Sequence, residues 1–299
     1  MCHSRKGVDP RVTEPNSTSI ELVSVHGGHS SEFGDADDSS LEEIICAYIS
    51  KGFKWVGITE HIPPVSADFL FPWEIEEGQT FESRMKRFTE YFLVARKLQR
   101  EYLDSIQILV GFETESYTGY VAHVNNLRHQ FQPDYIVGSV HHVKDICIDG
   151  PPEWYAQAVE KVGGIEALFC EYFDQQYELL EILEPEVIGH FDLIRMHDMD
   201  YRRRLETPKV KERIWRNLEK IKDLGSILDF NVRAFKKGGS EPYVSRSILE
   251  MALDLGVSCV PGDDSHGIQG VGLHLEKGIE ILKQSGFSTN WQIPGCYGT

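Results

Sequence analysis

The chain has 299 residues, 41% of them hydrophobic, which is enough for one large α/β domain or two smaller ones with a proper core. Its 47 acidic residues outnumber 30 basic residues, and the formal net charge of -17 argues against nucleic acid or an anionic membrane as the main partner. The sequence has no apolar run of about 18 residues and no signal-peptide core near its start, so it predicts a cytoplasmic protein.

The start of the chain differs in composition from the rest. Residues 1–19 are polar and contain Pro10, Pro15, Asn16 and Ser17, which predicts a loose extension. Residues 20–299 contain no clear linker, so we expect a single domain there. The six cysteines form no CxxC pair and no regular framework, which favours reduced, mostly buried thiols. No feature of the sequence indicates an oligomeric state.

Short apolar runs alternate with amphipathic stretches along the chain. Strands are predicted at 20–25, 55–59, 106–110, 135–137, 187–188, 227–231 and 257–260. Helices are predicted from Ser39 or Ser40 to Gly52, and over 79–104, 155–183 with a break at Gly163-Gly164, 209–224, 245–255 and 273–284. Strands that alternate with helices imply a parallel sheet, and about seven such units imply closure into a (β/α) barrel.

Clusters of histidine and carboxylate residues follow most of the predicted strands. They are His26-Gly27-Gly28-His29, Ile58-Thr59-Glu60-His61, Gly111-Phe112-Glu113-Thr114-Glu115, Gly138-Ser139-Val140-His141-His142, Gly189-His190-Phe191-Asp192 and Gly262-Asp263-Asp264-Ser265-His266. Imidazole and carboxylate groups bind zinc, iron or manganese, and the strand ends of a barrel meet at one rim. A single histidine is more often a core residue, but core histidines have no reason to choose strand ends. The pattern therefore predicts a multi-metal hydrolase.

In this order the clusters resemble the polymerase and histidinol phosphatase superfamily, PHP. The resemblance covers roughly residues 22–285. Its most specific parts are the stretches 58–64 (ITEHIPP), 138–142 (GSVHH), 187–195 (VIGHFDLIR) and 262–266 (GDDSH). The resemblance implies a distorted (β/α)7 barrel, TIM-barrel-like, that holds two or three divalent metal ions of zinc, iron or manganese.

The same resemblance implies three ligand sets that share one bridging carboxylate. The first set is His26, His29, Glu113 and Asp264. The second is Glu113, His141 and His190, and the third is His61 and His266. Among these residues, Glu113, Asp264 and His266 are expected to act closest to the reaction.

Two departures from the family pattern concern the first cluster. The family usually has His-x-His, whereas two glycines separate His26 from His29. Residues i and i+3 of an extended strand point different ways, so Gly27 and Gly28 must supply a bulge or turn. The family's further histidine, about ten residues on, is also missing. Asp35 is the best substitute and Asp37 the next, although both could simply lead into the following helix.

The histidinol phosphatase branch of the superfamily implies hydrolysis of L-histidinol phosphate, a step of histidine biosynthesis. A hydroxide that bridges two metal ions would attack phosphorus in line with the leaving alcohol. Arg195 and Arg233 could hold the remaining phosphate oxygens through bidentate hydrogen bonds, or could form surface salt bridges instead. Glu115 or Asp192 could meet the positively charged end of the substrate.

Two other functions remain open from the sequence. The first is the same chemistry on a different small phosphorylated substrate. The second is a barrel that has lost catalysis and serves as a binding module, which the irregular first cluster favours and the six intact clusters oppose. The segment 63–79 is rich in aromatic and acidic residues and could be a lid, an interface patch or a plain loop.

Overall fold

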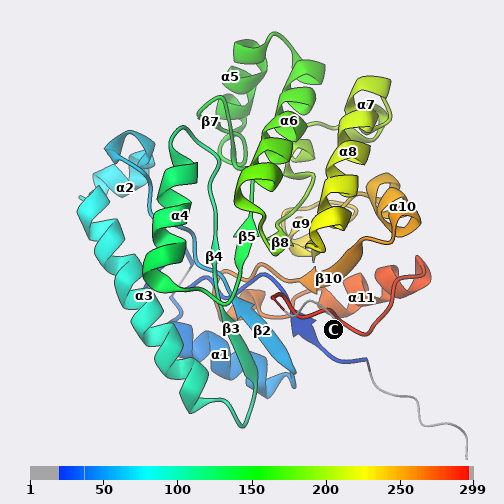
Figure 1. Ribbon diagram of the computed structural model, residues 1–299. Helices are drawn as coiled ribbons and strands as arrows, with labels where there is room; N and C mark the ends of the chain where they lie inside the picture. Colours follow the sequence, from blue (N-terminus) through cyan, green and yellow to red (C-terminus); the bar gives the residue numbers. More distant parts are fainter. Residues whose placement is uncertain (1–19, 37, 296–299) are drawn as a thin grey trace, which may run out of the picture.

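In the computed structural model, short strands run through the middle of the molecule and helices lie outside them (Figure 1). The structure describes residues 20–36 and 38–295, so the extension predicted over 1–19 and the candidate Asp37 lie outside the described residues. The strands are β1 (Val23–Ser24), β2 (Trp55–Ile58), β3 (Gln107–Val110), β4 (Phe112–Glu113), β5 (Ile136–Gly138), β6 (His142–Val143), β7 (Ile146–Cys147), β8 (Val187–Ile188), β9 (Ile227–Asn231) and β10 (Ser258–Gly262).

The helices follow the strands along most of the chain. They are α1 (Leu41–Ser50), α2 (Pro72–Glu76), α3 (Phe81–Glu101), α4 (Tyr120–Phe131), α5 (Pro152–Val162), α6 (Ile165–Leu183), α7 (Tyr201–Leu205), α8 (Pro208–Leu224), α9 (Arg233–Lys236), α10 (Arg246–Leu255) and α11 (Leu275–Gln284). No helix in the described part of the chain is both long and apolar enough to cross a lipid bilayer.

The strands form two parallel sheets, of order β1-β2-β3 and β10-β9-β8-β5-β4, and β6 and β7 form a separate antiparallel hairpin. In the larger sheet β10 pairs with β9 along its whole length, from Ser258 opposite Ile227 to Gly262 opposite Asn231. The prediction of an α/β fold with parallel strands is therefore confirmed. Buried residues such as Val56, Ile58, Ile136 and Leu228 belong to the larger of two apolar clusters, and a smaller cluster includes Val25, Val137 and Val260.

A single glycine connects the two sheets. Gly111 is the only residue between β3, which pairs with β2, and β4, which pairs with β5. A Cβ at Gly111 would lie 2.6 Å from the carbonyl oxygen of Tyr135, so only glycine lets the chain pass this close. On the other side, Val25 N donates to Pro261 O at 3.0 Å and Asp264 N to His26 O at 2.8 Å. The carboxyl ends of β1 and β10 therefore lie together.

Helix boundaries follow from capping residues. Ser40, rather than Ser39, caps α1: its hydroxyl accepts from Glu43 N, and the Glu43 carboxylate accepts from Ser40 N. Gly163, with a φ of 87°, ends α5, so the break predicted at Gly163-Gly164 is present. The strand predicted over 20–25 is shorter than expected and covers Val23 and Ser24 only, because β1 pairs in register with β2 only at these residues.

The described cysteines are free thiols, as expected, but not all of them are buried. Cys147 and Cys259 are buried, Cys170 is half-buried and Cys46 is exposed.

Candidate metal centre

Four imidazoles from four different segments of the chain surround one buried carboxylate, Glu113. Glu113 Oε2 lies 3.2 Å from His26 Nε2 and 3.1 Å from His61 Nδ1. Glu113 Oε1 lies 3.3 Å from His141 Nε2 and 2.8 Å from His190 Nε2. Because Glu113 ends β4, and these histidines follow β1, β2, β5 and β8, the topology alone brings them to one place.

The side chains sort into three groups whose potential ligand atoms lie within 4.8 Å of one another. The groups are His26, His29 and Asp264; His61, Glu113 and His141; and His29, Asp35, His61 and His266. They resemble the three expected sets. His190, expected in the second set, lies 3.1 Å from His141 between the Nε2 atoms. His29, expected only in the first set, also borders the third.

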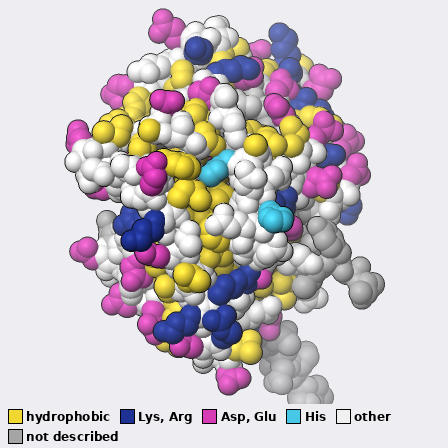
Figure 2. Space-filling view, turned by 60° about the vertical axis from the view of Figure 1, so that its left-hand side comes forward, with side chains coloured by type: hydrophobic (Ala, Val, Ile, Leu, Met, Phe, Trp, Pro, Cys, Tyr) yellow, Lys and Arg dark blue, Asp and Glu magenta, His cyan; other side chains and the backbone are white. Residues whose placement is uncertain are grey.

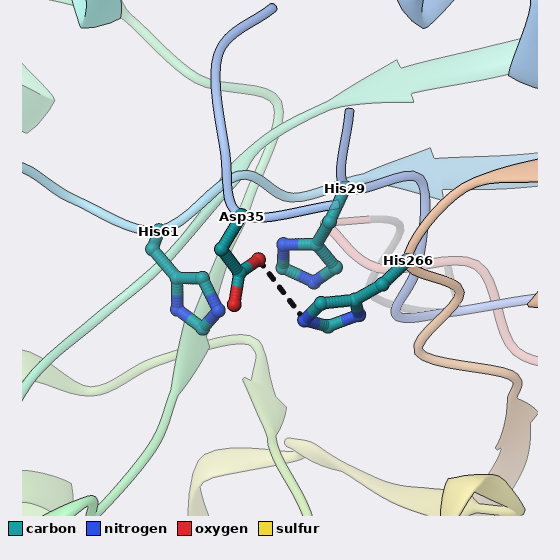
Figure 3. Close-up of side chains that lie close together, drawn as sticks. All are labelled: His29, Asp35, His61 and His266. Atoms are coloured by element: carbon teal, nitrogen blue, oxygen red, sulfur yellow. Dashed lines mark ion pairs between the residues drawn. The ribbon is translucent and has the colours of Figure 1, made fainter. Parts of the chain in front are cut away.

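The most exposed group contains the expected substitute, Asp35 (Figure 3). His29, Asp35, His61 and His266 point toward one another, and Asp35 Oδ1 lies 3.1 Å from His266 Nε2. Asp35 precedes the helix α1 by several residues, and Ser40 and Glu43 already cap that helix. This arrangement supports Asp35 as a ligand rather than as part of a helix start.

A turn at the two glycines lets His26 and His29 face one another. Gly28 has a φ of 79°, and the two ring centroids lie 5.8 Å apart. A Cβ on Gly27 would lie 2.5 Å from Asp263 Oδ1 and 2.6 Å from the Tyr48 hydroxyl. The turn that the spacing required is therefore present, and neither glycine position accepts a side chain without strain.

Several buried nitrogens at this centre fit a metal ion. His26 Nε2, both ring nitrogens of His29, and His61 Nδ1 have no partner with hydrogen-bond geometry in the described part of the chain. A buried polar atom without a partner is costly, and imidazole nitrogens next to carboxylates are what zinc, iron and manganese coordinate. The donor set therefore fits divalent metal ions.

Proton binding at the centre reflects the close packing of opposite charges. Burial by itself lowers the pKa of His29, but the nearby carboxylates of Asp264 and Glu60, at 3.4 and 3.7 Å, outweigh burial and raise this pKa to about 10. Burial by itself raises the pKa of Glu113, but the positive charges of His26, His61 and His141 hold it well below its usual range. The raised pKa of His29 means that its imidazole binds a proton next to the carboxylates when no metal ion is bound. A divalent cation would replace such protons.

A second layer of carboxylates orients the imidazoles. Asp229 Oδ2 lies 2.9 Å from His26 Nδ1, and Glu115 Oε2 lies 3.0 Å from His141 Nδ1. Glu60 Oε2 lies 3.7 Å from His29 Nδ1. We expected Glu115 to bind substrate, and the structure also gives it this orienting contact. Sequence analysis missed Asp229 and Glu60, although Asp229 and Asn231 alternate along β9 and Glu60 directly precedes His61.

Replacing Asp229 by asparagine is expected to lower metal affinity and kcat by about 10- to 100-fold, because the carboxylate fixes the ring orientation and the basicity of His26. Titration of the metal-free variant with Zn²⁺ or Mn²⁺, together with kcat, checks this. Asp223→Asn, on the exposed side of α8, is the matched control. Wild-type affinity in Asp229→Asn would show that the contact does not support the ligand.

The two candidate arginines occupy different settings. Arg195 is buried: its Nε lies 3.1 Å from Asp192 Oδ2, and its Nη2 donates to Glu241 O and Pro242 O. Its guanidinium also lies over the rings of Tyr201 and Tyr243. The Nε and Nη2 groups of Arg195 therefore already have partners within the protein. Because the side chain is buried, the alternative of a surface salt bridge is wrong.

Arg233 lies directly at the metal centre. Its Nη1 donates to the carbonyl oxygen of Asp264 at 2.8 Å, and its backbone N donates to Asn231 Oδ1. The structure therefore favours Arg233 over Arg195 as a phosphate ligand. Asp192, suggested for the positive end of the substrate, is fully buried and accepts hydrogen bonds from Ser245. That suggestion is wrong, because Asp192 cannot reach a ligand from there.

A cavity of about 600 Å³ opens beside the centre. His61, His141 and Asp35 line one end, and Phe71 and Trp73 from the segment 63–79 line the other. Figure 2 shows hydrophobic side chains gathered in a band across the middle of one face, with a histidine exposed within it. The segment 63–79 is thus a wall of the cavity and includes α2.

Comparisons with known proteins agree with this geometry. The model of the PHP domain family matches residues 26–233. A Schizosaccharomyces pombe protein named "Probable histidinol-phosphatase" is 36% identical over 271 residues, which cover 89% of this chain and 88% of that protein. The histidinol-phosphatase of Saccharomyces cerevisiae is 26% identical over 288 residues, with 84% of this chain and 85% of that protein covered.

A solved structure gives the same fold. Histidinol phosphate phosphatase from Lactococcus lactis, complexed with zinc, L-histidinol and phosphate, matches with a TM-score of 0.70 and 21% identity. The match covers 90% of this chain and 95% of that one. Together with the family match over most of the chain, these similarities show that the chain belongs to the PHP domain family.

Proposed function

We propose that this chain is a metal-dependent phosphomonoesterase that hydrolyses L-histidinol phosphate to L-histidinol and phosphate. The observation that carries the proposal is the convergence on Glu113 of histidines from four strand ends. The proposal for the substrate is supported by the 36% identity to a relative named as a histidinol-phosphatase, over nearly the full length of both chains. L-Histidinol and phosphate in the structurally similar Lactococcus protein also support it.

For the fold we propose that the described residues, 20–36 and 38–295, form one distorted (β/α)7 barrel domain. In support, β3 and β4 form one extended segment that serves both sheets, which leaves seven parallel strand positions. The backbone bonds Val25 N to Pro261 O and Asp264 N to His26 O join the remaining edges, β1 and β10. These contacts are the ones that closure of a barrel requires.

We propose two or three divalent metal ions, of zinc, iron or manganese, at the three groups of ligands. His26, His29, Glu113 and Asp264 would hold the first, and Glu113, His141 and His190 the second. His61, His266 and Asp35 would hold the third. Such ions supply positive charge against the phosphate oxygens and lower the pKa of the attacking water.

The chain's own residues supply position and charge around the phosphate. Glu113 contacts His26 and His61 through one oxygen and His141 and His190 through the other, so it fixes the spacing between two ligand sets. Arg233 places a guanidinium beside Asp264, where it would bind a phosphate oxygen. His266 and Asp264 lie 3.5 Å apart at the open edge, close to where the alcohol would leave.

A panel of phosphomonoesters tests the function. For protein reloaded with Zn²⁺ or Mn²⁺, kcat/KM for L-histidinol phosphate is expected to exceed that for nucleoside monophosphates and sugar phosphates by about 100-fold or more, since each 1.4 kcal/mol of discrimination is tenfold. Faster turnover of another small phosphate ester would support the proposed phosphomonoesterase chemistry but contradict L-histidinol phosphate as the substrate. No turnover with any divalent metal would indicate a binding module instead.

A further inference from the structure

The cavity next to the metal centre has one flat aromatic wall. The rings of Phe71 and Trp73 stack with centroids 4.6 Å apart and an angle of 8° between their planes. Trp154, in α5, lies parallel to both, at 6.0 Å from Phe71 and 5.9 Å from Trp73. Three parallel rings from two segments give a flat surface, which suits a planar ring in a ligand.

Five carboxylates line the same cavity: Asp35, Glu74, Glu77, Glu115 and Asp149. Asp35 contacts His266 and belongs to the candidate metal ligands. Glu74 is already bonded through both oxygens, to Phe71 N and to Arg84 Nε. Glu115 Oε2 contacts His141 and His142, and its Oε1 faces His61. Glu77 is exposed at the outer end. Only Asp149 thus combines partial burial, closeness to the metal centre and a free oxygen.

The hairpin of β6 and β7 fixes the position of Asp149. The hairpin begins directly after the metal-ligand candidate His141, and Ile148 N donates to His141 O at 2.8 Å. Cys147 Sγ donates to Asp149 Oδ1 at 3.2 Å, while Oδ2 accepts no hydrogen bond within the described residues. The next residue, Gly150, lies against the ring of Trp154, where an added Cβ would come within 2.4 Å. Asp149 therefore sits between the metal centre and the aromatic wall.

The proposed substrate has a matching layout. L-Histidinol phosphate carries its phosphate on a primary alcohol, an ammonium group on the adjacent carbon and an imidazole ring one carbon further. With the phosphate at the metal ions, the ammonium lies a few bonds into the cavity and the planar ring beyond it. A carboxylate near the metal centre and a flat aromatic surface beyond it complement these two groups in the same order.

Resting on the proposed function, we propose that Asp149 is a specificity-determining residue that binds the ammonium group of the substrate, while Phe71 and Trp73 pack against its ring. Asp149 takes no part in breaking the phosphate ester. Asp149 favours the binding of phosphate esters that carry a cationic group next to the ester carbon. It does not strengthen the binding of phosphate esters that lack such a group.

The test compares Asp149→Asn with wild type, both as full-length, metal-loaded protein. A hydrogen bond to a charged group contributes about 1.5–3 kcal/mol, so kcat/KM for L-histidinol phosphate is expected to fall about 10- to 100-fold, mainly through KM. For p-nitrophenyl phosphate, which has no ammonium group, kcat/KM is expected to stay within about twofold of wild type. Glu77→Gln, a carboxylate at the outer end of the same cavity, is the matched control and should leave both substrates unchanged.

Calorimetric titration gives a readout that is independent of turnover. In Asp149→Asn the dissociation constant of L-histidinol is expected to rise by the same factor, whereas that of inorganic phosphate stays at the wild-type value. An unchanged L-histidinol affinity, or equal losses for both phosphate esters, would overturn the role of Asp149. If wild-type protein hydrolyses p-nitrophenyl phosphate but not L-histidinol phosphate, the proposed function itself fails, and the inference with it.

Discussion

Replacing Glu113 by glutamine is expected to lower kcat by about 1,000-fold or more, the largest loss of any single substitution in this chain. Glu113 is buried and is the one carboxylate in contact with His26, His61, His141 and His190. Glutamine keeps its shape but removes the negative charge that two neighbouring cations would share. Loss of about 4 kcal/mol of transition-state stabilisation corresponds to this factor. Steady-state kinetics and metal content of the purified variant measure the two effects together.

Two comparisons make the Glu113 result specific. Glu219→Gln, on the exposed face of α8, removes the same charge far from the centre and should keep wild-type kcat. A thermal unfolding scan of Glu113→Gln should show a single cooperative transition, which separates loss of the site from loss of the fold. Full metal content together with kcat within tenfold of wild type would contradict a bridging role for Glu113.

Removing the metal ions is expected to lower the midpoint of thermal unfolding by about 8–16 °C. A ligand present at 1,000 times its dissociation constant stabilises the native state by about 4 kcal/mol, and in a domain larger than 150 residues each kcal/mol shifts the midpoint by about 2–4 °C. The buried nitrogens of His26, His29 and His61 that lack hydrogen-bond partners are the source of this stabilisation. Scanning calorimetry after chelation, and again after reloading with Zn²⁺ or Mn²⁺, gives the shift directly.

The same scans on Glu113→Gln provide the control. With its central ligand weakened, the variant should respond less to reloading than wild type. Equal midpoints for chelated and reloaded wild type would mean that no ion binds in the folded state, and the interpretation of the site would then fail. Reloading with Mg²⁺, which prefers oxygen ligands, should restore less of the midpoint than Zn²⁺, because imidazoles dominate this centre.

The fold and the inner residues of the site were predictable because each depends on a local signal. A parallel strand shows as a short apolar run, and a ligand at its carboxyl end follows within a few residues, as His141 follows β5 and His190 follows β8. The turn between His26 and His29 could be inferred because a spacing of three residues is incompatible with an extended strand unless a glycine such as Gly28 adopts a positive φ.

What the sequence did not reveal depends on contacts between distant segments. Nothing near Asp229 indicates that it lies 2.9 Å from His26, since 203 residues separate them. The packing of the Arg195 guanidinium over the ring of Tyr243 also joins segments that are distant in the sequence. The hairpin of β6 and β7 was missed because each strand has only two residues, too few for any periodic pattern.

The connection of the two sheets through Gly111 also has a consequence for the order of folding and metal binding. Glu113 follows this glycine by two positions and is held by β5 on one side and by the segment at Glu60 on the other, through Glu113 N to Glu60 O at 3.0 Å. The first and third proposed ions take ligands from segments of both sheets, so neither half of a nascent chain contains a complete coordination shell for these two ions. Tight binding of these two ions therefore requires that the segment after β10, with Asp264 and His266, has been synthesised and has packed against the segments after β1 and β2.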